Sequence, residues 1–160
     1  MRILGVKLFF LLAILLITLS NYSNAAMQDD GHWHWLGSNE SMGLFINTET
    51  IRYEIKNNNI NRNLISGWFL YVYDSSHAEK YLNNPNIRYG KILAQIDSNN
   101  KKLRNLQQVF YDYNEQPVNT NNKVQSWEYV VPGTNGDVIY RSLLEYSTKY
   151  PEKVEKNTKP

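Results

Sequence analysis

The sequence predicts an α+β domain, a single antiparallel sheet of about six strands in a meander-like order, with a C-terminal helix packed on one face. Short runs rich in aromatic and β-branched residues recur along the chain and favour strands. Asn pairs, which are typical of turns, fall between these runs. The strand patterns come first and the best helix pattern comes last, as in an α+β fold. The length of 160 residues fits one domain.

The N-terminal part has the pattern of a secretory signal peptide over residues 1–25. Arg2 and Lys7 precede an apolar run at residues 8–19, and small residues follow up to Ala25, after which we expect cleavage, with the next residue as the alternative. An uncleaved anchor is disfavoured because the run is shorter than the ~20 residues that span a bilayer. No second apolar run follows. We therefore expect an exported protein in the periplasm, at the cell surface or secreted, with no transmembrane segment in the mature chain.

Composition excludes several classes of function. The chain has no Cys, so a disulfide framework, a thiol nucleophile and a lipid-modified cysteine are ruled out. It has 17 Lys and Arg against 15 Asp and Glu, and the expected signal peptide contains two of the basic residues and no acid. The charges of the mature chain then balance, which does not support a nucleic-acid partner held by bulk charge.

The first half of the mature chain predicts strands separated by corners. Residues 26–32 are short and polar and should be loose. Strands are expected at residues 43–46 and 51–56, with a tight corner between them, and the strongest strand at residues 64–74. That strand is bulky on both faces, so it should be central in the sheet, with Trp68 as a buried core anchor.

The second half predicts a short helix, a hairpin and a last strand. The helix covers residues 76–82 and begins with a Ser suited to capping. Residues 91–97 and 103–113 flank a polar turn, which indicates a hairpin. A short strand at residues 127–131 ends at a Pro-Gly pair.

The better helix is expected at residues 135–149. Thr134 is its N-cap, and one apolar stripe recurs at helical spacing. The stripe consists of Ile139, Leu143, Tyr146 and Tyr150. Pro151 should end the helix, and the charged stretch at residues 150–160 should be a disordered tail, because Val154 is its only aliphatic residue.

Two histidines open the predicted domain. His32 and His34 are two apart, so on a strand they would share one face and could share a metal ion. We favour the alternative that Trp33 and Trp35 face the core while both histidines face water. The only other histidine is His77, and no carboxylate cluster accompanies the pair.

Catalytic patterns are missing from the sequence, which contains no G-x-S-x-G, H-E-x-x-H or phosphate-loop motif. We therefore expect no enzyme and assign no catalytic, cofactor-binding or metal-binding residue and no cofactor. The binding residues are left unassigned. A basic turn at residues 101–104 either contacts an acidic partner or is a solvated hairpin tip, and the second interpretation is favoured.

Tyrosine is the dominant aromatic, with 12 copies. Tyr71, Tyr73, Tyr111 and Tyr113 lie on the predicted central strands. A tyrosine buries its ring and keeps a polar tip, so these residues indicate either a ligand-binding sheet face or a half-buried face under loops or a dimer partner.

Three stretches of the chain form a series in a fixed order. Residues 35–51 run from W-L-G-S-N through G-L-F-I to T-E-T-I, and residues 67–71 read G-W-F-L-Y. Residues 109–133 run from V-F-Y-D-Y-N to W-E-Y-V-V-P-G, just before the last helix. Over about residues 33–146 the chain thereby resembles the surface-adhesin E family, the protein E-like adhesins of Gram-negative bacteria.

This resemblance implies a surface-adhesin E-like domain at residues 33–149 with a single antiparallel sheet and a terminal helix. It also implies a non-enzymatic binding module, because the best-known members bind host matrix and serum proteins. Some members form dimers, so a homodimer is an alternative to a monomer. No contact residue transfers, since the matching positions are framework positions. Two other interpretations stay open, namely a structural or stress-related envelope protein of unknown ligand and a small-ligand or metal carrier.

The chain departs from the family pattern at two places. Members often carry a pair of Cys that ties the sheet to the C-terminal helix, and this chain has none. The helix must therefore dock by packing alone. The family's Gly in the turn after Y-D is replaced by Glu115 or Gln116.

Overall fold

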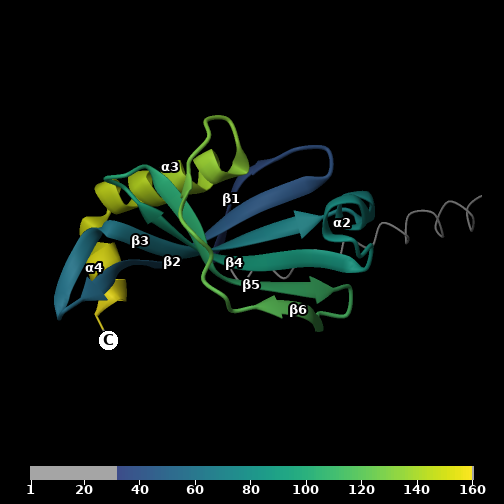
Figure 1. The fold of residues 1–160 in the computed structure, drawn as a ribbon, viewed down its shortest axis with the longest axis horizontal. Coiled ribbons are helices and arrows are strands. Elements are labelled where there is room, and N and C mark those ends of the chain that lie inside the picture. The colour runs from purple at the N-terminus through teal and green to yellow at the C-terminus, as the bar shows by residue number, and fades with distance from the viewer. Residues whose placement is uncertain (1–31, 160) are drawn as a thin grey trace, which may run out of the picture. The chain divides into compact units, whose positions relative to one another are not determined.

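The computed structural model describes residues 32–159, and about half of these residues lie in strands of one antiparallel sheet (Figure 1). The strands are β1 (Trp33–Ser38), β2 (Met42–Lys56), β3 (Asn59–Tyr73), β4 (Ile87–Asp97), β5 (Lys102–Asp112), β6 (Pro117–Asn121) and β7 (Glu128–Tyr129). The order β1 to β6 follows the sequence, so each strand pairs with the one before it, and β7 pairs with β5. The predicted meander is confirmed.

Three helices accompany the sheet in the described part of the chain. They are α2 (Ser75–Leu82), α3 (Asn135–Lys149) and α4 (Pro151–Thr158). The helix that was predicted at residues 135–149 is confirmed as α3. The expected signal peptide, and all of the expected loose segment except His32, lie outside the described residues.

The core lies between the helices and one face of the sheet. Directly opposite residues of antiparallel strands share a face, so the register places Phe69 beside Ile46 and Ile92. Phe69 is fully buried, and Leu143 of α3 joins the same cluster. The other buried members are Met42, Leu44, Ile46, Ile51, Tyr53, Ile65, Tyr71, Tyr73, Ala78, Ile87, Ile92, Ala94, Ile96, Ile139, Tyr140 and Val154. The central place predicted for β3 is confirmed, since it lies between β2 and β4.

Glycine allows α3 to pack closely on the sheet. A Cβ at Gly67 of β3 would lie 3.0 Å from Leu143 Cδ2 and 3.2 Å from Ile51 Cγ1. Gly90 of β4 faces the same side, where a Cβ would lie 2.9 Å from the Phe110 ring. These two positions make room for large side chains that a residue with a Cβ would displace.

The corner predicted within residues 43–56 is wrong. β2 runs unbroken from Met42 to Lys56, and its pairing with β3 only shifts register between Asn47 and Arg52. The Thr50 hydroxyl bridges this irregularity, because it donates to the Asn47 carbonyl at 2.7 Å and accepts from the Trp68 N–H at 2.9 Å. The Thr-Glu-Thr sequence therefore bends a continuous strand instead of ending it.

Side chains cap the N-termini of α2 and α3. Thr134 accepts from the Asp137 N–H at the start of α3, and Asp137 in turn accepts from the Gly133 N–H. The predicted N-cap of α3 is confirmed. For α2 the cap is Asp74, whose carboxylate accepts from the His77 N–H at 2.7 Å, so the Ser predicted for that role is wrong.

The prediction of a disordered tail at residues 150–160 is also wrong for residues 150–159, the part of that stretch that the structure describes. Pro151 ends α3 and begins α4, where its fixed φ suits the first turn. Val154 is completely buried, and Thr158 is 7% exposed. β1 pairs only with residues 43–47 of β2, so the outer edge of β2 beyond them lies open to α4.

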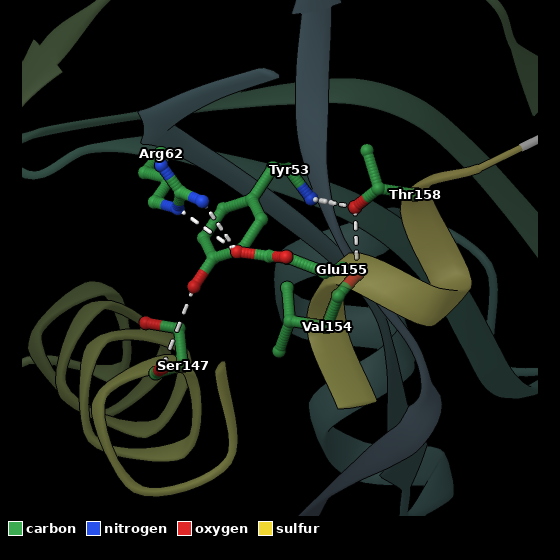
Figure 2. Close-up of polar contacts among 6 residues, drawn as sticks. All are labelled: Tyr53, Arg62, Ser147, Val154, Glu155 and Thr158. Atoms are coloured by element: carbon green, nitrogen blue, oxygen red, sulfur yellow. Dashed lines mark hydrogen bonds and ion pairs between the residues drawn. The ribbon is translucent and has the colours of Figure 1, made fainter. Parts of the chain in front are cut away.

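Polar side chains of α4 form hydrogen bonds with the backbone groups of that edge (Figure 2). Thr158 Oγ1 accepts from the Tyr53 N–H at 2.9 Å and donates to the Val154 carbonyl. Asn157 Nδ2 donates to the Ile51 carbonyl at 3.1 Å. Figure 2 also shows the ion pair between Arg62 and Glu155, at 2.6 Å. The helix thus covers a strand edge that would otherwise be free to pair with another chain.

The turn after β5 contains both of the residues that could replace the family's glycine, and one of them has a left-handed backbone. Glu115 has a φ of +60°, in the left-handed region where glycine has no steric penalty. The turn is held by Asp112, whose carboxylate accepts from the N–H groups of Asn114 and Gln116. Of the two residues, Glu115 is therefore the one whose backbone conformation favours glycine.

The buried tyrosines of β3 predict a loss of stability at alkaline pH. Burial raises the pKa of Tyr71 to about 12 from an ordinary 10.0, and it also raises the pKa of Tyr73. The folded state keeps both phenols neutral where the unfolded state ionises them. The free energy of unfolding should therefore keep its full value below pH 10 and decrease as the pH rises towards 12. Urea denaturation at both ends of that range measures the loss, and an unchanged stability would contradict the buried placement.

Candidate functional site

The sheet face opposite the core has no helix packed on it in the described structure. The apolar side chains that the helices bury, Ala78, Ile139, Leu143 and Val154 among them, all belong to the core cluster. We call the other side the open face. Its members, placed by the register, include Trp33, Trp35, Phe45, Trp68, Leu70, Tyr89, Lys91, Leu93, Val109 and Tyr111.

Aromatic side chains concentrate where β1, β2 and β3 meet on the open face. Trp35 lies opposite Phe45, which in turn lies opposite Leu70. Trp35 is 63% exposed, whereas Leu70 is completely buried. Trp68 is half-buried on this face and lies outside the core cluster, so its predicted role as a core anchor is wrong. The result is an apolar surface with a buried base and an exposed rim.

Lys91 is the central cation of this aromatic surface. Its Nζ lies 5.9 Å from the centre of the Trp33 ring and 5.7 Å from that of Tyr111. Tyr111 also stacks on Tyr89 with a centroid distance of 4.7 Å. Such cation–π contacts hold the ammonium group over the rings and fix their orientation.

A polar pocket lies elsewhere on the open face, and we call it the Arg104 pocket. Its volume is about 370 Å³, and Arg104 reaches it from β5. The pocket is lined by Arg52, Tyr53, Glu54, Ile55, Ser66, Gln95, Arg104, Leu106 and Thr158. Gln95 is only 4% exposed, and it joins Glu54 to Arg104 through hydrogen bonds. The sequence indicated only a basic turn here, and the structure places Arg104 within a strand and against the sheet.

The two N-terminal histidines lie in different surroundings. His32 Nδ1 is 2.8 Å from Glu49 Oε2, whereas His34 lines a pocket beside Tyr146 and Lys149 of α3. Trp35 is largely exposed, so the prediction that both Trp33 and Trp35 face the core is wrong. Within residues 32–159, no three ligating side chains come close enough together to hold a metal ion.

His77 meets a serine from a distant part of the chain. Ser41 Oγ lies 3.0 Å from His77 Nδ1, and the histidine ring packs between Tyr73 and Tyr81. The nearby carboxylate of Asp74 accepts from the His77 backbone N–H and caps α2. The contact therefore ties the loop after β1 to α2, and its chemistry is that of a structural hydrogen bond.

The four tyrosines that the sequence singled out lie in different surroundings. Tyr71 and Tyr73 are buried in the core, so they offer no binding surface. Tyr111 is half-buried on the open face, and Tyr113 lies beyond the end of β5 with half of its surface exposed. Tyr89, which the sequence did not single out, completes the stacked pair on the open face.

No helix among the described residues is both long and apolar enough to cross a bilayer.

Comparison with known proteins identifies the family. A search of curated proteins finds no match to the chain. The family model of the surface-adhesin protein E matches residues 33–143, from the first residue of β1 into α3, so α4 lies beyond the matched part. The match covers more than half of the chain, which therefore belongs to the surface-adhesin protein E family.

Proposed function

We propose that this protein is an exported, non-enzymatic adhesin module that binds host matrix or serum proteins through its open face. The family is one of surface adhesins, which supports a binding role at the cell surface. We choose the open face because Trp35, which lies on this helix-free side of the sheet, has 63% of its area exposed. Large apolar side chains that lie together on a surface mark interaction sites.

The composition of the open face suits protein recognition. Binding hot spots are enriched in Trp, Tyr and Arg, which lie at the centre of an interface and lose water there. Trp33, Trp35 and Phe45 lie on neighbouring strands and can be covered together by one partner. Leu70 beneath them is fully buried, so the surface is supported and changes little on binding.

Replacing Trp35 with Ala should weaken binding without unfolding the domain. An exposed aromatic hot spot typically costs about 2 kcal/mol or more on truncation, which is roughly thirtyfold in affinity. Binding of the purified mature chain to immobilised basement-membrane extract and to whole serum measures the loss. Tyr81→Ala is the matched control, because Tyr81 is equally exposed, at 63%, but belongs to α2.

Two results would contradict this assignment. In the first, Trp35→Ala and Tyr81→Ala bind as well as the parent chain. In the second, neither the basement-membrane extract nor serum binds the parent chain, which would favour the alternative of an envelope protein without a host ligand. If the open face instead forms a homodimer, the Trp35→Ala variant should have a lower mass in solution than the parent chain.

Export is the other part of this proposal, and residues 1–25 would supply the signal, with cleavage after Ala25. N-terminal sequencing of the mature protein checks the cleavage. Labelling of intact cells with an antibody then separates a surface location from a purely periplasmic one. Mature protein that still begins at Met1 would contradict export. Labelling only after the outer membrane is broken would leave export intact but would contradict the adhesin role at the cell surface.

A further inference from the structure

We infer that the Arg104 pocket is a second binding site, which takes a small carboxylate that also carries a hydroxyl or amine donor. This inference rests on residues of the pocket alone and does not depend on the adhesin role of the aromatic surface. It follows from a fixed guanidinium group, from the charges around it and from the size of the pocket.

Hydrogen bonds fix the Arg104 side chain before any ligand binds. Gln95 Oε1 accepts from Arg104 Nε at 2.9 Å and from its Nη2 at 2.6 Å. Gln95 Nε2 donates to Glu54 Oε2 at 2.8 Å. A carboxylate only accepts and a guanidinium only donates, so the amide of Gln95 has one possible orientation between them. The Arg104 guanidinium is also stacked on the Trp127 ring, with 4.2 Å to its centre.

The outer edge of the same guanidinium is available to a ligand. An arginine has five N–H donors, and Gln95 occupies the edge formed by Nε and Nη2. The edge formed by Nη1 and the second Nη2 hydrogen has no hydrogen-bond partner within residues 32–159. Two parallel donors of this kind match the two oxygens of a carboxylate.

The charges of the pocket select a ligand with one negative charge. Arg52 and Arg104 both line it, and neither forms an ion pair with a carboxylate of the described chain. Glu54 lies in the same lining, and it repels a second negative charge but accepts a hydrogen bond from a hydroxyl or an amine. Arg104 therefore holds the carboxylate, and Glu54 selects a donor group beside it.

The size of the pocket points to a ligand no larger than one sugar or one amino acid. Its volume of about 370 Å³ lies near the lower limit of the usual range for small-molecule sites. A sugar acid and a free amino acid both combine a carboxylate with a hydroxyl or amine. The two sources share the chemistry that the pocket recognises, and an experiment distinguishes them.

Titration of the isotope-labelled mature chain, followed by NMR, tests the site. D-glucuronate is the sugar-acid probe, L-serine is the amino-acid probe, and D-glucose is the control that lacks a carboxylate. We expect at least one of the two carboxylates to shift the signals of Trp127 and Gln95 saturably, and D-glucose to leave them unchanged. The probe that binds identifies the source of the ligand.

Variants link the binding to the arginine fork. Arg104→Gln removes two charge-assisted hydrogen bonds and should weaken binding by roughly tenfold to a hundredfold. Arg104→Lys keeps the charge without the fork and should lose most of the same affinity. Lys123→Gln removes one positive charge from an exposed site outside the pocket and should bind like the parent.

Three outcomes would overturn the inference. Neither carboxylate binds at any concentration that its solubility allows, D-glucose binds as tightly as D-glucuronate, or a folded Arg104→Gln variant binds like the parent. Circular dichroism and the melting temperature establish whether each variant is folded. Arg52→Gln provides a second test because Arg52 is exposed and its loss leaves the Glu54–Gln95–Arg104 chain intact, so its binding should also weaken.

Discussion

Deleting residues 150–160 should destabilise the domain by about 3–6 kcal/mol, through lost apolar burial and lost hydrogen bonds. The deletion removes the completely buried Val154 and uncovers the core beneath it. It also leaves the N–H of Tyr53 and the carbonyl of Ile51 without the partners that α4 supplies. A domain of this size has only about 5–15 kcal/mol of stability in all, so the loss is a large fraction.

Thermal melts of the deletion measure this effect, and point variants locate it. Val154→Ala should lose the burial term alone, and Thr158→Val should lose the hydrogen bond to the Tyr53 N–H while keeping the side-chain volume. Lys156→Ala is the control, because Lys156 is exposed on the same helix. The deleted form should also self-associate, since the edge of β2 is then open. A deletion that melts like the parent would mean that α4 adds nothing to the fold.

Replacing Leu143 with Asp should be at least as disruptive. Leu143 is completely buried, and its Cδ2 lies 3.0 Å from where a Cβ on Gly67 would be. The carboxylate would enter the core without a cation, which costs several kcal/mol beyond the ~2–5 kcal/mol of the lost side chain. With no disulfide in the chain, α3 depends on this packing. The expected result is an unfolded or molten variant at neutral pH.

Acid should partly rescue that variant, and this separates the charge from the cavity. Desolvation raises the pKa of a buried carboxyl, so the folded state favours the protonated form. The deficit relative to the parent should therefore shrink as the pH falls towards about 4, where the unfolded carboxyl is also protonated. Leu143→Ala is the control, since it makes the cavity without the charge and should show no such pH dependence. Equal deficits for both variants at every pH would contradict the buried position.

The sequence predicted the elements whose local pattern agrees with their packing. β3 was recognised because consecutive residues such as Phe69 and Leu70, which lie on opposite faces, are both apolar, and only a central strand can bury both faces. α3 was recognised because Leu143 and its stripe recur at helical spacing and Thr134 caps the start. The hairpin of β4 and β5 was recognised because a polar turn separates two apolar runs.

Other elements could not be predicted because tertiary contacts decide them. β6 consists of exposed residues without an apolar alternation, so its pairing with β5 alone makes it a strand. α4 contains one aliphatic residue, Val154, and its stability comes from the unpaired edge of β2, which is distant in sequence. A polar composition indicates disorder only when no neighbouring element offers hydrogen-bond partners.

The candidate site was the least predictable part. Trp35 sits in a sequence that reads as a buried strand, and its exposure depends on which face the helices cover. Arg104 sits in a run of basic residues that reads as a solvated turn. Its hydrogen bonds to Gln95 join two neighbouring strands, and only the register of β4 with β5 places the two residues opposite each other.

Oxidative footprinting of the mature chain, alone and mixed with basement-membrane extract or serum, tests the proposed use of the open face most directly. Mass spectrometry reports how strongly each aromatic side chain is modified in either state. We expect Trp33 and Trp35 to become protected on binding, while Tyr81 on α2 and Tyr146 on α3 keep their reactivity. Protection of Tyr81 or Tyr146 with unchanged reactivity at both tryptophans would show that the helix-covered side binds, and would contradict the assignment of the open face.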